Sequence, residues 1–178
     1  MKKIVVFFGL LMANPLLAQK FMTRNAEVYF FSDKEAVEVV EATNNQVGAV
    51  IDLGTETIAF QIQMRAFHFD IALMEEHFNE NYVESELYPK ATFRGAFKDL
   101  PSDLSKEESL LVYGTMDFHG IQKEMEIPVR IVLKEDVLEG STKFNLLCSD
   151  FNIDIPKLVA DKIANSIEVS ITARLTKL

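Results

Sequence analysis

Residues 110–133 read LLVYGTMDFHGIQKEMEIPVRIVL, and this segment decides the fold because both faces of its two arms can be read from the letters. Apolar side chains take every second position in each arm, with mostly polar ones between them, which is typical of a half-buried strand. Gly120 lies between the arms and accommodates the positive φ of a tight turn. The segment therefore predicts a β-hairpin. Pro128 cannot donate a backbone hydrogen bond, so we expect a bulge or an unpaired position in the second arm.

The same alternation recurs on both sides of this hairpin. We expect further strands at residues 28–31, 36–41, 47–53, 58–65, 91–98, 144–149 and 167–175. Turn residues between them predict reversals at Asn44-Asn45, Gly54-Thr55 and Glu139-Gly140. The apolar residues occupy even positions up to Met64 and odd positions from Phe67 onward. This change of parity after Arg65 predicts a β-bulge or the end of that strand.

Two segments depart from strand spacing. Leu73, Met74, His77 and Phe78 fall on one face of a helix, so residues 71–78 predict a short helix, followed by an ordered loop through Pro89. Residues 156–165 predict an irregular or helical link. The chain is therefore all-β with one short helix. About eight or nine amphipathic strands joined by short turns pair antiparallel, and this spacing leaves both a sandwich and a closed barrel open.

The N-terminus resembles an export signal. Lys2 and Lys3 precede an apolar run at residues 4–13, and Ala18 supplies a small residue at the expected cleavage site. We expect residues 1–18 to be a signal peptide, residues 19–178 to form one domain, and the mature protein to be periplasmic or secreted. No later segment is long and apolar enough to span a bilayer, so stable membrane insertion is not expected.

Charge and cysteine content exclude some partners. The net charge is −9, which repels phosphate backbones and anionic head groups and argues against nucleic acid binding. The chain has one cysteine, so an internal disulfide is excluded. Cys148 shares its parity with Phe144 and Leu146, and we interpret it as a small buried hydrophobic residue.

Motifs for catalysis or metal binding are weak. His68, His77 and His119 stand in different predicted elements, without the spacing of a zinc site. The one local cluster joins Glu75, Glu76 and His77 to Glu80, and it suits a solvated helix end better than a divalent ion site or a general base. We expect no catalytic residue, no metal and no cofactor.

Three segments carry a family resemblance. They are GTMDFHGIQK at residues 114–123, EHFNENYVES with YPKATF between residues 76 and 93, and SDFNI at residues 149–153. Together they resemble the YceI family of lipid- or polyisoprenoid-binding proteins, although Met116, Asp117, Ile121 and Gln122 depart from its pattern. The resemblance implies an eight-stranded antiparallel lipocalin-like β-barrel, without catalysis, whose apolar tunnel takes an isoprenoid or fatty amphiphile.

Apolar and aromatic side chains are the candidates for the tunnel wall. They are Phe30, Phe60, Ile62, Met64, Phe67, Phe69, Leu73, Phe78, Phe93 and Phe97. The same bulky residues suit a barrel that is filled by its own side chains and serves as a structural or stress-related protein, so both interpretations stand. The expected partner is a small hydrophobic ligand, and a homodimer is compatible with the sequence.

Overall fold

A computed structural model describes residues 19–32, 39–155 and 165–178 of the chain. The first half of the expected strand at residues 36–41, most of the link at 156–165 and the expected signal peptide lie outside the described residues. The eight strands are β1 (Lys20–Ser32), β2 (Glu41–Asp52), β3 (Thr57–Gln63), β4 (Lys90–Lys98), β5 (Glu108–Phe118), β6 (Ile121–Lys134), β7 (Val137–Leu147) and β8 (Ser166–Lys177).

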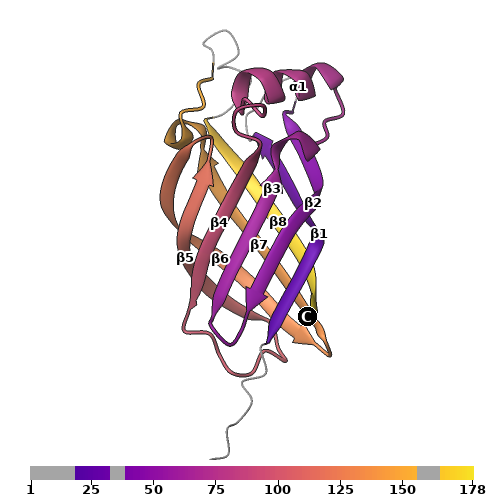
Figure 1. The fold of residues 1–178 in the computed structure, drawn as a ribbon, viewed down its shortest axis with the longest axis vertical. Helices are drawn as coiled ribbons and strands as arrows, with labels where there is room; N and C mark the ends of the chain where they lie inside the picture. Colours follow the sequence, from indigo (N-terminus) through magenta and orange to yellow (C-terminus); the bar gives the residue numbers. More distant parts are fainter. Residues whose placement is uncertain (1–18, 33–38, 156–164) are drawn as a thin grey trace, which may run out of the picture.

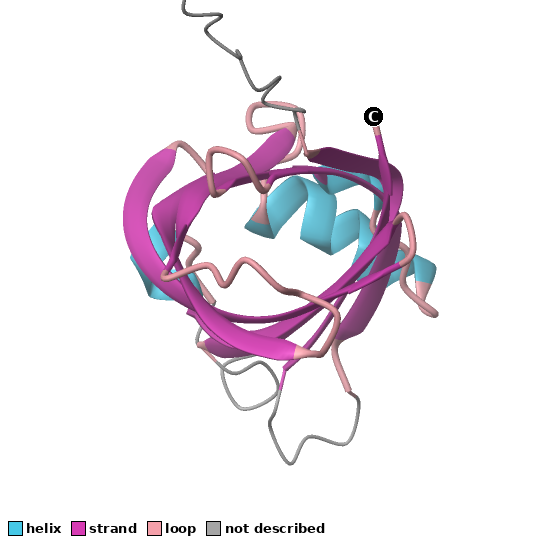
Figure 2. Ribbon diagram, turned by 90° about the horizontal axis from the view of Figure 1, so that it is seen from below, coloured by secondary structure: helices cyan, strands magenta, loops and turns pink. Residues whose placement is uncertain are grey.

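The strands form a closed antiparallel barrel. Each strand pairs with the next along the chain, and β8 pairs with β1, so the ring is complete (Figures 1 and 2). Closure settles the choice between sandwich and barrel, because a continuous ring leaves no edge strand unpaired. The expected eight-stranded antiparallel barrel is confirmed.

One helix lies across one end of the barrel, called the helix end below (Figure 1). Helix α1 (Ala72–His77) continues into a π-helical turn, η2 (Phe78–Tyr82). β3 ends at Gln63, where the 3-10 turn η1 (Met64–Ala66) changes the parity of the following residues. The strand end expected after Arg65 therefore occurs two residues earlier.

The β5–β6 hairpin forms as expected. Phe118 pairs with Ile121, and the two residues between them, His119 and Gly120, have φ angles of 50° and 74°. Positive φ at both central residues matches the twist of the flanking strands.

Pro128 ends the pairing between β6 and β7. Pairing stops at Val129 and Thr142, although β6 itself runs back to Ile121 and β7 runs on to Leu147. Pro128 has no N–H to donate to the ladder, and its carbonyl accepts a hydrogen bond from the Thr142 hydroxyl at 2.5 Å. The unpaired spot expected at Pro128 is thus confirmed on the β7 side, whereas on the β5 side Pro128 pairs in register with Leu111 without a bulge. We call residues 121–128 of β6 and 143–147 of β7 the β6–β7 seam.

Two expected turns are wrong. Asn44-Asn45 lies inside β2, beside a register shift between β1 and β2. The Asn44 side chain donates to the Gln63 carbonyl at 2.9 Å and accepts from the Gln46 N–H at 2.8 Å, so it supplies the backbone partners that the irregular strand lacks. Glu139-Gly140 lies inside β7, and the chain reverses instead at Glu135, whose φ is 55°.

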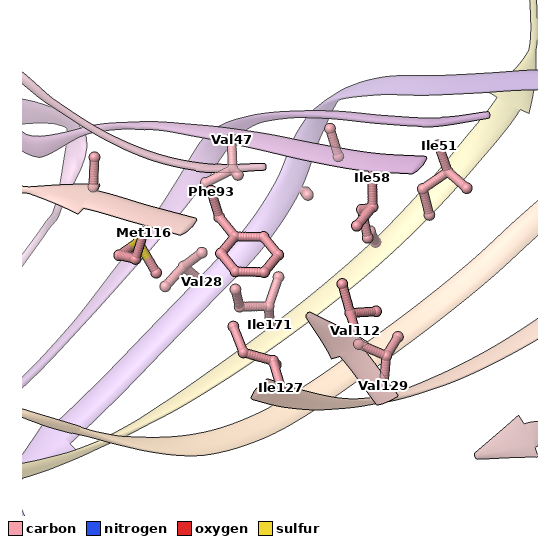
Figure 3. Packing of buried hydrophobic residues seen from close by; sticks show 14 of the residues in the cluster. Val28, Val47, Ile51, Ile58, Phe93, Val112, Met116, Ile127, Val129 and Ile171 are labelled. Carbon is pink, nitrogen blue, oxygen red and sulfur yellow. The ribbon is translucent and has the colours of Figure 1, made fainter. Parts of the chain in front are cut away.

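Half of the barrel is a packed core. At the end far from α1, inward-facing side chains from β1–β8 and Leu104 of the β4–β5 loop are no more than 5% exposed: Phe21, Ile51, Ile58, Phe97, Leu104, Val112, Ile131, Leu138 and Leu175. The Leu133 N–H donates to the Leu104 carbonyl at 2.7 Å and fastens that loop to the barrel. Figure 3 shows apolar side chains meeting around Phe93 with no polar atom among those drawn.

Two facing glycines make room for the Phe93 ring. Gly95 of β4 pairs with Gly114 of β5 on the inward face. A Cβ on Gly114 would lie 2.4 Å from the Arg94 carbonyl oxygen and 2.7 Å from the Phe93 ring. The ring therefore packs directly on backbone.

Cys148 is buried at the start of the 3-10 turn η3 (Cys148–Phe151), as expected, and burial raises the pKa of its thiol to about 11. At pH 8 this leaves roughly one thiolate in a thousand molecules, and the thiolate is the reactive form. We expect a disulfide reagent such as DTNB to label the native protein at least ~100-fold more slowly than the urea-unfolded chain. Labelling at equal rates would show that the thiol is accessible.

Candidate functional site

The inward-facing side chains of β6, β7 and β8 near the helix end are only half-buried. They are Met125, Phe144, Leu146, Ile167 and Val169. Most inward-facing residues at the far end are buried, so these β6–β8 side chains are packed less tightly than the core at that end. The looser residues flank the β6–β7 seam, where two strand ends face each other without backbone pairing. The candidate site is therefore the lumen near the seam and beneath α1.

A small apolar cavity lies in the middle of the lumen, between the packed far end, represented by Ile58 and Val112, and the seam, represented by Phe144. Its volume is about 30 Å³, and it is lined by residues from β3–β8. Among the wall residues expected from the sequence, Phe60, Ile62 and Phe93 line it, together with Met116 and Phe144. A volume of 30 Å³ corresponds to about one water molecule, whereas sites for drug-sized ligands occupy about 300–1,000 Å³. Side chains must move before a long tail fits.

Four of the expected wall residues form one aromatic cluster toward the helix end. Phe30 of β1 contacts the rings of Phe67, Phe69 and Phe78 at centroid distances of 5.3, 5.9 and 5.6 Å. Phe78 also contacts Phe67 and Phe69, at 5.5 and 5.1 Å. The cluster joins the η2 turn that follows α1 to β1 and to the segment after β3. It closes this side of the lumen with rings rather than backbone.

The remaining three expected wall residues lie elsewhere. Met64 and Phe97 are buried, at 3% and 5% exposure, and neither lines the cavity. Leu73 is 57% exposed, which corrects the expectation that it faces a tunnel. The reason is that α1 buries none of its residues, and the aromatic contact with the barrel is made by Phe78, after α1 ends.

The acidic cluster around His77 does not converge. Glu75 turns away from His77 and lies 3.8 Å from His68, while its carboxylate accepts the Phe69 N–H at 3.2 Å. Within the described ranges, no three His, Cys, Asp or Glu side chains are close enough to hold a metal ion. Two larger hollows, of about 530 and 460 Å³, lie on the outer face of the barrel, and the lining of the first is mainly polar while that of the second is mainly apolar.

His119 joins three segments at the helix end, which the sequence did not reveal beyond its role in the turn. Its Nδ1 lies 2.8 Å from the Phe151 carbonyl of η3, and its Nε2 lies 3.0 Å from a Glu84 carboxylate oxygen. The Tyr88 ring packs edge-on against it at 4.5 Å. Both ring nitrogens lie within hydrogen-bond distance of an oxygen atom. The imidazole thus links the β5–β6 turn to η3 and to the loop after η2.

Replacing this imidazole is expected to loosen η3. His119→Asn keeps the positive φ, which Asn tolerates, but shortens the side chain. Because hydrogen bonds to charged groups contribute about 1.5–3 kcal/mol, we expect a loss of unfolding free energy in that range, measured by urea denaturation at pH 6, and faster labelling of Cys148. His68→Asn is the control, since His68 is 70% exposed. Equal stability of both variants would show that the junction is not fastened by His119.

Within residues 19–32, 39–155 and 165–178, no helix has the length and apolar character needed to cross a bilayer.

Comparison with known proteins places this barrel among similar structures. The chain resembles a polyisoprenoid binding domain from Saccharophagus degradans implicated in plant cell wall breakdown, with 12% identity over 90% of this chain and 99% of that one, and a TM-score of 0.77. BcnA from Burkholderia cenocepacia has 15% identity over 85% and 96% of the two chains, with a TM-score of 0.71. The Campylobacter jejuni YceI protein has 12% identity over 100% and 99%, with a TM-score of 0.57. At these identities the likeness shows the fold alone.

The sequence itself carries the family assignment. Comparison with curated proteins gives no significant match. A model of the YceI-like domain matches residues 20–175, which run from the first residue of β1 into the last strand. The match includes all three segments that carry the resemblance: the hairpin, the helix segment and SDFNI. The chain belongs to the YceI-like domain family.

Proposed function

We propose that this protein binds an isoprenoid-like or fatty amphiphile non-covalently in the half of the barrel that lies toward the helix end. The observation that carries the proposal is the half-burial of Met125, Phe144, Leu146, Ile167 and Val169. These side chains face inward, yet the barrel leaves part of their apolar surface uncovered. Covering such surface with a hydrocarbon tail is favourable at roughly 25 cal/mol per Å². The polyisoprenoid binding named for the Saccharophagus domain supports the same ligand class.

Room for the tail has to come from side-chain movement. The cavity beside these residues holds only about 30 Å³. Met125 is unbranched and adapts its shape readily, and it lies on the seam, where the ladder that joins β6 to β7 has stopped. Burial of a C15 tail at about 0.8 kcal/mol per CH₂ supplies enough free energy for micromolar binding after the costs of association and rearrangement. The proposed function contains no bond-making step.

Native mass spectrometry of the purified protein tests this proposal. We expect a fraction of the molecules to carry an additional mass that organic extraction removes, and the extracted protein to bind a fluorescent fatty-acid probe. Failure to detect a bound lipid together with failure to bind the probe would contradict the proposal. The same spectrum gives the number of chains per particle and so tests whether the protein forms a homodimer.

A barrel filled by its own side chains is the second candidate, and the small cavity volume favours it. In that case the protein serves as a structural or stress-related partner, and the half-burial near the seam reflects loose packing only. The substitution of Phe93 described in the Discussion separates the two candidates.

Export completes the proposal. The basic start, apolar run and Ala18 support a cleaved signal over residues 1–18 and a periplasmic or secreted location. Sequencing the N-terminus of the protein recovered outside the cytoplasm tests it: a chain that still begins at Met1 would contradict cleavage.

A further inference from the structure

A lysine occupies an apolar position of β6. Exposure alternates along Ile121–Ile131, and the odd residues are consistently the less exposed ones. Lys123 is one of these, between Ile121 and Met125, so its side chain lies on the inward face. Among the described strand residues at the helix end, Lys123 is the one charged side chain of inward parity.

Lys123 lies on the seam and is the cross-strand neighbour of a residue that lines the cavity. It pairs in register with Met116 of β5, which lines the cavity, and side chains paired across antiparallel strands lie about 5 Å apart. On the other side the β6–β7 ladder has stopped, so no strand covers it. The half-buried Met125 and Leu146 flank the seam beside it. One cation therefore stands at the edge of an apolar lumen.

The partner of Lys123 is a partly exposed carboxylate outside the strands of the barrel. Its ammonium forms an ion pair with Asp150 of η3, and the two side chains are 40% and 30% exposed. Ion pairs that remain this exposed contribute little to stability, because water and salt screen them. Asp150 follows the end of β7 by three residues and belongs to no strand. Another anion can replace its carboxylate at small cost.

We infer that Lys123 binds the head group of the amphiphile, and that the head group is anionic, a carboxylate or a phosphate. This inference rests on the proposed function. The tail lies among Met116, Met125 and Phe144, and the head remains at the seam with its oxygen atoms on the Lys123 ammonium. Asp150 occupies this position when the barrel is empty and competes with the ligand. The ammonium binds either anion as a point charge, since it has no fixed fork geometry.

Three C16 ligands that differ in the head group test the inference: hexadecanoate, hexadecyl phosphate and hexadecanol, each displacing a fluorescent lipid probe. We expect the wild type to bind at least one of the anions about 10-fold more tightly than the alcohol, and the stronger anion identifies the head group. Lys123→Met is expected to remove this preference while hexadecanol binding changes less than 2-fold. Asp150→Asn is expected to tighten binding of the anions several-fold, since it removes the competing carboxylate.

The control is a lysine on the other side of the seam. Lys143→Met removes the same charge from β7, but Lys143 points outward and pairs with Glu168 at 2.6 Å, so the preference should persist. Lys123→Gln, which removes the charge but stays polar at this half-exposed position, covers the case in which Lys123→Met fails to fold, and the same loss of preference is expected for it. Equal affinity of the wild type for all three ligands, or a preference that survives Lys123→Met, would overturn the inference and leave the proposed function intact. Absence of binding of all three contradicts the proposed function itself.

Discussion

Gly114→Ala is expected to destabilise the barrel more than any surface substitution. The new Cβ would lie 2.4 Å from the Arg94 carbonyl and 2.6 Å from the Gly95 Cα, and both of these are backbone atoms that cannot rotate away. Relieving the clash separates β4 from β5 and displaces the Phe93 ring. Overpacking of a core typically costs about 1–3 kcal/mol, and we expect the upper part of that range or more. This corresponds to a fall in Tm of roughly 6–12 °C, measured by circular dichroism.

Gly48→Ala is the matched control for this substitution. Gly48 also lies in a strand, but a Cβ there would meet nothing closer than the Gln61 carbonyl at 3.9 Å. We expect its stability to change by less than about 1 kcal/mol, since alanine also reduces the entropy of the unfolded chain. If both variants lose the same stability, the close approach of β4 and β5 at the facing glycines is not real.

Phe93→Ala is the second substitution with a large expected effect. The ring is 6% exposed and lines the lumen cavity, so removing it enlarges an apolar void. Truncation of a buried phenylalanine costs about 3–5 kcal/mol, because burial is lost and the surroundings collapse only in part. We expect the midpoint of urea unfolding to fall accordingly. Phe31→Ala, on the outward face beside Tyr29, should cost much less.

Ligand binding by the same variant distinguishes the two candidate functions. If the wild type binds the fluorescent lipid probe, the enlarged lumen of Phe93→Ala should bind it more tightly, because less side-chain movement is needed. If the wild type binds no probe and only the variant does, the native barrel is filled and the carrier role is refuted.

The strand arrangement could be predicted well where sequence alternation was regular. The β5–β6 hairpin, its two-residue turn and the break at Pro128 all follow from residue types whose geometry allows few alternatives. The turn at Asn44-Asn45 was wrong because an asparagine satisfies backbone groups inside an irregular strand as well as in a turn. The turn at Glu139-Gly140 was wrong because glycine is common in turns, whereas here it continues β7. A Cβ on Gly140 would meet nothing closer than 3.7 Å, so the strand does not require a glycine at this position.

The candidate site could be predicted only in part. Four of the predicted wall residues do come together, although they belong to different segments: Phe30, Phe67, Phe69 and Phe78. Phe30 points inward from β1, and the other three lie in the segments that cross the helix end of the barrel. The seam could not be predicted, since it depends on where the hydrogen-bond ladder between β6 and β7 stops and not on residue type alone. Lys123 was missed, yet a signal existed: a charged residue in the apolar phase of an otherwise regular strand.

The missing donor at Pro128 also determines where the barrel can yield. A guest that spreads the wall between Met125 and Leu146 ruptures no interstrand hydrogen bond, because none joins those strand segments. Widening there disturbs only the contacts of flexible side chains, because the pairing of β6 with β5 and of β7 with β8 runs on through this segment and holds both strands. A single imino acid thus marks a flank of the cylinder that can expand without unzipping the wall.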